Sequence, residues 1–317
     1  MRLTKLQREY KPLNRQVNEQ FYKLTLVMKN FLIVSSAIVL LSSCGSEPQN
    51  KHLTYQNIVI LSDLSSRIDN KPPKDSAEIH KIVQYFKNEC VKPGEKIGDK
   101  SSICFSSFSD KVIATIDIDK IKNLSEKQQF INSTGKFQNS GLNHQIDDFE
   151  LKVKSAYANI RNKGLDLISI LIEKIENEPI VKKDTYLTDG IDTTYLKYDN
   201  QIYIFTDGYL EYLNKSTNNQ FYFGSPEIDK IRQYCIANNV DISNAIKTNQ
   251  SLCLTPIKSK KNQFINLHIL ETHERDKNDR LQTYKYPVGQ RDNEILEAVW
   301  RKWATESGFK SFEWKKY

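Results

Sequence analysis

Two short, strongly apolar segments constrain the fold of this chain more than any other feature. Residues 58–61 (Ile-Val-Ile-Leu) and residues 202–205 (Ile-Tyr-Ile-Phe) each have the length and composition of a strand buried on both faces. Strands of that kind belong to parallel sheets that helices cover on both sides. The two segments therefore predict an α/β domain with a mostly parallel central sheet.

Helical and strand-like patterns alternate along the rest of the chain, which favours a sheet wrapped by helices. We predict a Rossmann-like open sheet, mostly parallel, with helices on both faces and one antiparallel edge strand. The other predicted elements are a helix capped by Asp75 or Ser76, a hairpin of strands 103–105 and 112–116, helices near 145–160 and 165–176, a helix capped by Ser225, a strand at 264–270 and a helix at 293–306 that ends at Gly308.

Some aromatic and histidine side chains invite a functional interpretation that their spacing does not favour. Trp300 and Trp303 lie on one face of the predicted last helix, so we expect them in the core. His268 lies inside a predicted strand, and we expect a hydrogen-bonded histidine there instead of a catalytic base.

The beginning of the chain predicts a membrane anchor. An apolar run at residues 31–41 follows Lys29 and is too short to cross a bilayer, which takes about 20 residues, but it has the length of a signal-peptide core. The run ends in Leu41-Ser42-Ser43-Cys44, which resembles the lipobox of bacterial lipoproteins. That resemblance implies cleavage before Cys44 and lipidation of its thiol, so we expect a lipoprotein of the cell envelope, in the outer membrane.

These features divide the chain into four segments. Met28 directly precedes Lys29, so we expect translation to start there and residues 1–27 to be an upstream extension. Residues 28–43 form the predicted signal peptide, and residues 44–54 have the composition of a tether. Residues 55–317 then form one α/β domain.

The charge of the mature chain argues against a nucleic-acid partner. The full sequence has a net charge of +7, but seven of its Lys and Arg residues and only two of its acids lie before Cys44. Their removal leaves 39 basic and 37 acidic residues, a net charge of +2. Nucleic-acid binding depends on a strongly basic face, which this composition does not predict.

Four cysteines follow the predicted lipidation site: Cys90, Cys104, Cys235 and Cys253. An oxidising envelope compartment permits disulfides, whereas unpaired cysteine is itself a common core residue. Both states remain open, and no spacing among the four resembles a zinc site.

The two strongest predicted strands both end in an acidic turn, and there the chain resembles von Willebrand factor A domains. In that family one strand runs into Asp-x-Ser-x-Ser and a later strand ends in Thr-Asp-Gly; the corresponding residues here are Asp63-Leu64-Ser65-Ser66-Arg67 and Thr206-Asp207-Gly208. The resemblance covers roughly residues 55–310. It implies a Rossmann-like sheet, a divalent cation at its carboxyl edge, and binding of another protein.

Residue by residue, the resemblance assigns cation ligands to Asp63, Ser65 and Asp207, and such oxygens suit Mg²⁺. Arg67 stands where the family has serine, and the best match to the second loop, residues 164–167, carries leucine where threonine belongs. The positive charge of Arg67 would repel a cation 4 Å away by about 4 kcal/mol at an effective dielectric of 20. We therefore favour a degenerate, cation-free site in which Arg67 bridges the two aspartates, with Mg²⁺ as the alternative.

Threonines elsewhere offer a substitute for the missing loop ligand. Thr188, Thr193 and Thr194 are the candidates, although their spacing does not favour them.

An enzyme is the first alternative function. Asp63 and Asp207 are a possible carboxylate pair for hydrolysis or phosphoryl transfer. However, the sequence has no nucleophile elbow, no phosphate-binding glycine loop and no His-Glu-x-x-His motif. We expect no catalysis.

We predict a lipid-anchored envelope protein that binds another envelope or extracellular protein through three loops, which we call the carboxyl-edge loops: residues 62–75, 162–167 and 206–224. A solute-binding lipoprotein is the second alternative, but that class needs two lobes. Aromatic side chains are common anchors at protein interfaces. The expected anchors, clustered in the third loop with Phe223, are Tyr209, Tyr212, Phe221 and Tyr222.

Overall fold

The computed structural model describes residues 50–64, 72–92, 100–108, 112–159, 166–188, 192–212 and 221–317. The chain divides into two units, one formed by residues 1–51 and 187–194 and the other by residues 52–186 and 195–317. Cys44 and the predicted leader lie outside the described residues. The sites considered below belong to the second, larger unit.

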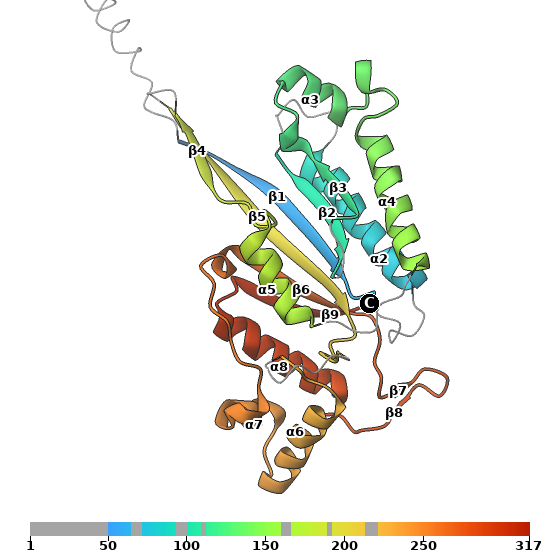
Figure 1. The fold of residues 1–317 in the computed structure, drawn as a ribbon, viewed down its shortest axis with the longest axis vertical. Helices are drawn as coiled ribbons and strands as arrows, with labels where there is room; N and C mark the ends of the chain where they lie inside the picture. Colours follow the sequence, from blue (N-terminus) through green and yellow to red (C-terminus); the bar gives the residue numbers. More distant parts are fainter. Residues whose placement is uncertain are drawn as a thin grey trace, which may run out of the picture. The chain divides into compact units, whose positions relative to one another are not determined.

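A mostly parallel sheet forms the centre of the larger unit (Figure 1). Its strands lie in the order β3-β2-β1-β5-β6-β9, and β4 pairs with β5 off this path. Among the described strands, β1–β2, β5–β6 and β6–β9 are parallel pairs and the edge strand β3 is antiparallel to β2, which confirms the predicted antiparallel edge. The strands of this sheet are β1 (Asn50–Ser62), β2 (Ser102–Ser107), β3 (Ala114–Asp117), β4 (Thr185–Thr188), β5 (Thr193–Thr206), β6 (Ile265–Glu271) and β9 (Ser311–Lys316).

Side chains alternate between two cores because successive residues of a strand point to opposite faces. From β1, Val59 and Leu61 enter one core together with α5 (Leu167–Asn177), α6 (Ser225–Asn238), α7 (Ile242–Thr248) and α8 (Asp292–Ser307). Ile58 and Ile60 enter the other, with α2 (Pro72–Tyr85), α3 (Leu124–Ile131) and α4 (Leu142–Ala158). Each buried aliphatic side chain contributes about 1.5–3 kcal/mol, so the two cores hold the sheet between its helices.

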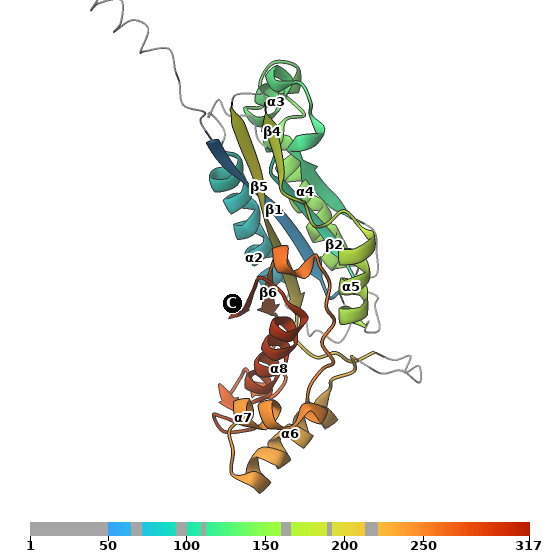
Figure 2. The same cartoon turned by 90° about the vertical axis from the view of Figure 1, so that its left-hand side faces the viewer.

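The helices of the two cores are separate in space. In Figure 2, α6 and α7 lie together with α8, whereas α2 and α4 pack against each other beside β1 and β2. A small second sheet of β7 (Lys277–Asn278) and β8 (Thr283–Tyr284) follows β6. Among the described helices, none has both the length and the apolar character needed to cross a bilayer.

Most predicted elements are present, with shifted ends. The predicted helices at 145–160, 165–176 and 293–306 correspond to α4, α5 and α8, and α8 ends at Gly308 with φ of 84°. Helix α3, helix α7 and strand β9 were not predicted.

Two predicted helix caps are wrong. Helix α2 begins at Pro72, so Asp75 and Ser76 lie inside its first turns, and the Asp75 carboxylate accepts a hydrogen bond from Tyr317 Oη at 2.6 Å. The N-cap of α6 is Gly224, whose N–H donates to Glu227 Oε2 at 3.0 Å, and Ser225 is the first helical residue. In both places the helix starts earlier than side-chain preference alone indicates.

The predicted core position of the tryptophans and the predicted hydrogen bonding of His268 are confirmed. Trp300 and Trp303 are each 1% exposed, with ring centroids 5.6 Å apart. His268 bonds to Glu313 at 2.7 Å and to Gln201 at 2.6 Å. Among the described residues, Cys104, Cys235 and Cys253 form no disulfide, and burial raises the pKa of Cys104 to about 12.

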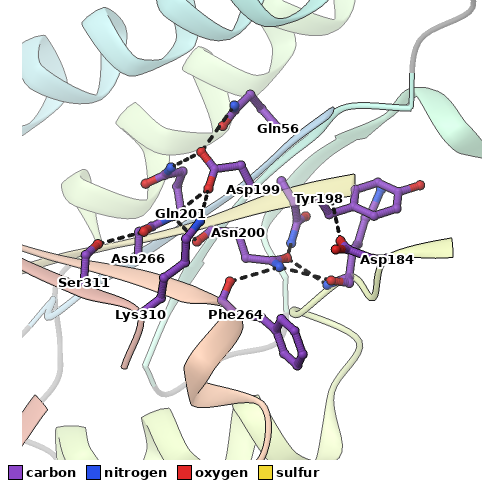
Figure 3. Close-up of polar contacts among 12 residues, drawn as sticks. Gln56, Asp184, Tyr198, Asp199, Asn200, Gln201, Phe264, Asn266, Lys310 and Ser311 are labelled. Atoms are coloured by element: carbon purple, nitrogen blue, oxygen red, sulfur yellow. Dashed lines mark hydrogen bonds and ion pairs between the residues drawn. The ribbon is translucent and has the colours of Figure 1, made fainter. Parts of the chain in front are cut away.

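Polar side chains join the middle of β1 and β5 to the beginnings of β2, β6 and β9; Figure 3 shows part of this network. On one face Ser102 Oγ donates to Asn57 Oδ1 and Asn57 Nδ2 donates to Asn200 Oδ1, both at 2.8 Å. On the other face Ser311 Oγ and Asp199 Oδ1 each bond to the side-chain amide of Asn266 at 2.7 Å. These contacts, which we call the amide ladder, cross β2, β1, β5, β6 and β9 and fix their register.

Candidate functional site

The two acidic turns lie at the ends of neighbouring strands, as predicted. Strands β1 and β5 are adjacent, and Asp63 N donates to Phe205 O at 2.8 Å. Because Asn57 bonds to Asn200 further back along the same pair, the two strands run in parallel. Asp63 and Asp207 are 4% and 1% exposed. Both carboxylates are therefore buried at the carboxyl edge of the sheet, the usual ligand site in open α/β folds.

A guanidinium holds the Asp207 carboxylate, and it belongs to Arg275. Its Nε and a terminal nitrogen approach Asp207 Oδ2 at 2.7 and 2.6 Å, and its other terminal nitrogen donates to Glu211 Oε2 at 2.7 Å. Burial opposes the charge, but Asp207 and Glu211 outweigh it and raise the pKa of Arg275. The planar guanidinium group has several N–H donors in fixed directions, so it can bind two carboxylates at once.

The arginine also lies over an aromatic ring that extends the network. The Arg275 guanidinium carbon is 3.8 Å from the centre of the Tyr209 ring. Tyr209 Oη donates to Asp292 Oδ2 at 2.5 Å, and burial together with this bond raises the pKa of the Tyr209 phenol. Asp292 in turn accepts from Arg232 at 2.5 Å. A continuous chain of charged and aromatic groups thus connects the β5 turn to the start of α8.

Gly208 lets this turn lie against the core. It has φ of 84°, and a Cβ atom there would lie 2.5 Å from Trp314 Cη2. Its carbonyl accepts a hydrogen bond from Trp300 Nε1 at 2.8 Å, and its N–H donates to Thr206 Oγ1 at 3.1 Å. Only glycine fits both the backbone angle and the space.

Several predicted ligands have other positions or lie outside the described residues. Ser65 and Arg67 fall outside them, as does residue 164 of the proposed second loop. Asp166, from that loop, caps α5 by accepting from Ser169 N at 3.1 Å. The alternative threonines at positions 188, 193 and 194 lie in β4 and β5, within the smaller unit.

The predicted partner anchors divide into buried and half-buried rings. Tyr209 and Phe221 are 2% and 5% exposed and belong to the core, so their rings offer no surface to a partner. Tyr212 and Tyr222 are half-buried and pack edge to face with centroids 5.7 Å apart. The prediction of an aromatic anchor therefore narrows to these two tyrosines.

A polar cavity of about 420 Å³, which the sequence did not predict, lies at the carboxyl ends of β6 and β9. Glu271 and Thr272, the residues at the end of β6, line it. Burial raises the pKa of Glu271 to about 7, although Lys316 and Trp314 oppose the shift. The signal was available in the sequence, since Glu271 directly follows the predicted strand 264–270, and Asp63 comes two residues after the apolar segment 58–61.

The described residues do not provide the oxygen set of a magnesium site. Among them, no three His, Cys, Asp or Glu side chains are grouped to hold a metal ion. A cation at Asp207 would also have to displace the Arg275 guanidinium from Oδ2. No known protein family matches the chain, and no curated protein matches it.

Proposed function

We propose that this chain is a lipid-anchored protein of the cell envelope, in the outer membrane, and that its domain binds another envelope or extracellular protein without catalysis. The carboxyl-edge loops are the binding surface, as in the von Willebrand factor A domains that the sequence resembles. The observation that carries the proposal is the position of Asp63 and Asp207 at the ends of adjacent parallel strands. Ligands of open α/β sheets bind at this edge.

The binding that we propose does not depend on a cation. In the cation-dependent site, a metal ion joins the loops; here Arg275 links Asp207 to Glu211 with a fixed positive charge. The sequence analysis gave Arg67 the role of bridging Asp63 and Asp207. Arg67 lies outside the described residues, and among them Arg275 supplies a guanidinium to Asp207. Asp207 and Glu211 both belong to the loop at residues 206–224, so the side chain of Arg275 holds this loop without a metal ion.

Photo-crosslinking tests the binding surface. A photoreactive amino acid replaces Tyr222 in full-length protein on intact envelopes, and the exposed Tyr186 on β4 receives the same residue as the matched control. We expect one specific protein adduct from position 222, unchanged by a metal chelator, and no such adduct from position 186. Identical products from both positions, or loss of the adduct on chelation, would contradict the proposal.

Fatty-acid labelling tests the anchor separately. Cys44→Ser should abolish both incorporation of the label and recovery in the membrane fraction, because the acyl chains provide the membrane affinity. Cys253→Ser, which changes a cysteine within the folded domain, should leave both unchanged. Label retained in Cys44→Ser would refute lipidation at this residue.

A further inference from the structure

The cavity beside β6 is a built site, with walls from several parts of the chain. Glu271 and Thr272 come from the end of β6, and Lys316 and Tyr317 from the end of β9 and the residue after it. Lys74 from α2 and Tyr284 from β8 also line the cavity, together with His273, Glu274, Lys277 and Asp279. Its volume of about 420 Å³ falls within the range of about 300–1,000 Å³ typical of small-molecule sites.

Two wall residues have hydrogen-bonding capacity that the described residues do not use. Glu271 and Thr272 are 3% and 0% exposed. Glu271 Oε2 accepts from Trp314 Nε1 at 3.1 Å, but Glu271 Oε1 and Thr272 Oγ1 have no hydrogen-bond partner among the described residues. Such buried groups each cost about 1–3 kcal/mol, so native proteins rarely leave them unsatisfied. Both residues line the cavity, so a ligand whose hydrogen-bonding groups reach these two atoms would satisfy them.

The charges in the wall favour a neutral ligand. Three lysines and three carboxylates line the cavity, and Lys316 already pairs with Glu274 at 2.6 Å. An anion would face the carboxylates, and a cation would face the lysines. Helix α2 offers little to an anion, because its first two residues are Pro72 and Pro73, which have no N–H.

The half-buried rings of Tyr284 and Tyr317 add flat apolar surface to this polar wall. Hydroxyl groups can both donate and accept, so they match a wall of mixed donors and acceptors. We propose that this cavity binds a neutral, polyhydroxylated ligand, a saccharide of one or two rings. Lys74 belongs both to this wall and to the first carboxyl-edge loop, but binding of a sugar in the cavity needs no protein partner.

Calorimetry on the detergent-solubilised full-length protein tests the proposal with glucose, N-acetylglucosamine and maltose as neutral probes. Inorganic phosphate and lysine serve as charged probes. We expect at least one sugar to bind with a Kd of about 1 mM or tighter. Trp314 fluorescence should change on binding, because this indole donates to Glu271.

Substitutions locate the binding. Thr272→Val should weaken sugar affinity about tenfold, since it removes one buried hydrogen bond. The isosteric Glu271→Gln should also change the affinity for the sugar. It is the second cavity variant and replaces Thr272→Val if that protein does not fold. Thr305→Val, on the exposed face of α8, should have no effect. The proposal is overturned if no sugar binds, if a charged probe binds in preference, or if the folded cavity variants bind sugar like the parent.

Discussion

At the scale of single residues, Gly208 and Gly289 form a natural pair for testing how tightly the β5 turn is packed. Both have φ of 84°, but a Cβ at Gly208 would collide with Trp314, whereas a Cβ at Gly289 meets nothing within 4 Å. Gly289→Ala should lower the free energy of unfolding by about 1–2 kcal/mol, the cost of the left-handed backbone. Gly208→Ala should lower the free energy of unfolding by about 1–3 kcal/mol more than Gly289→Ala does, because its Cβ collides with Trp314. Equal losses in urea denaturation would show that the turn is not packed against Trp314.

Glu271 predicts a pH dependence of stability. Its folded pKa of about 7 lies above the ordinary 4.5, so between these values the folded state holds a proton that the unfolded state has lost. Stability therefore falls as pH rises from about 4.5 to 7, by about 3 kcal/mol from this group. In urea denaturation across this range, the free energy of unfolding of Glu271→Gln should increase relative to that of the parent protein as pH rises. A constant difference between the two proteins would contradict the prediction.

Part of the site could be predicted at this scale. The positions of Asp63 and Asp207 follow from a rule of parallel sheets, which brings the carboxyl ends of neighbouring strands to one edge. Arg275 could not be assigned to Asp207, because 68 residues separate them and no sequence pattern connects them. Tyr209 and Phe221 resemble surface anchors in composition alone, and only the packing of their loop against α6 and α8 buries them.

At the scale of elements, the amide ladder is the feature with the clearest energetic consequence. Asn200 donates to the carbonyls of Lys182 and Phe264 and accepts from Asn57 and Lys182. Asn200→Ala should lower the free energy of unfolding by about 2–3 kcal/mol or more, because it leaves several buried groups unpaired.

The matched control for the ladder is Asn238→Ala in α6. Asn238 is exposed and its side chain donates one hydrogen bond, to Tyr234 O. The control should change stability by no more than about 0.5 kcal/mol. If denaturant melting gave similar losses for both substitutions, the amide ladder would not be a determinant of stability.

Which elements the sequence predicts depends on their burial. Strands β1, β5 and β6 contain apolar runs and were predicted, whereas β9 lies at the edge of the sheet with mostly exposed or half-buried residues. An edge strand needs no continuous apolar run, so its pattern is weak. The predicted start of α2 is too late, because Asp75 has a side chain typical of a helix cap. In the structure this carboxylate instead accepts a hydrogen bond from Tyr317.

At the scale of the whole larger unit, the two ends of the sheet differ in character. The amide ladder crosses the middle of β1 and β5 and the beginnings of β2, β6 and β9, whereas the ion pair of Arg275 with Asp207 lies at the carboxyl edge. The α/β class and the parallel order followed from two apolar segments and the alternation of elements. The partner and the anchor stay predictions, because neither leaves a trace in the packing of the domain.

Magnesium calorimetry tests the central claim most directly, namely that Arg275 takes the place of a cation at Asp207. The account predicts no saturable binding with a Kd below about 1 mM for the parent protein. The exposed Glu173→Ala serves as a charge-matched control for Asp207→Ala. Binding tighter than about 1 mM that is lost in Asp207→Ala and kept in Glu173→Ala would contradict the account.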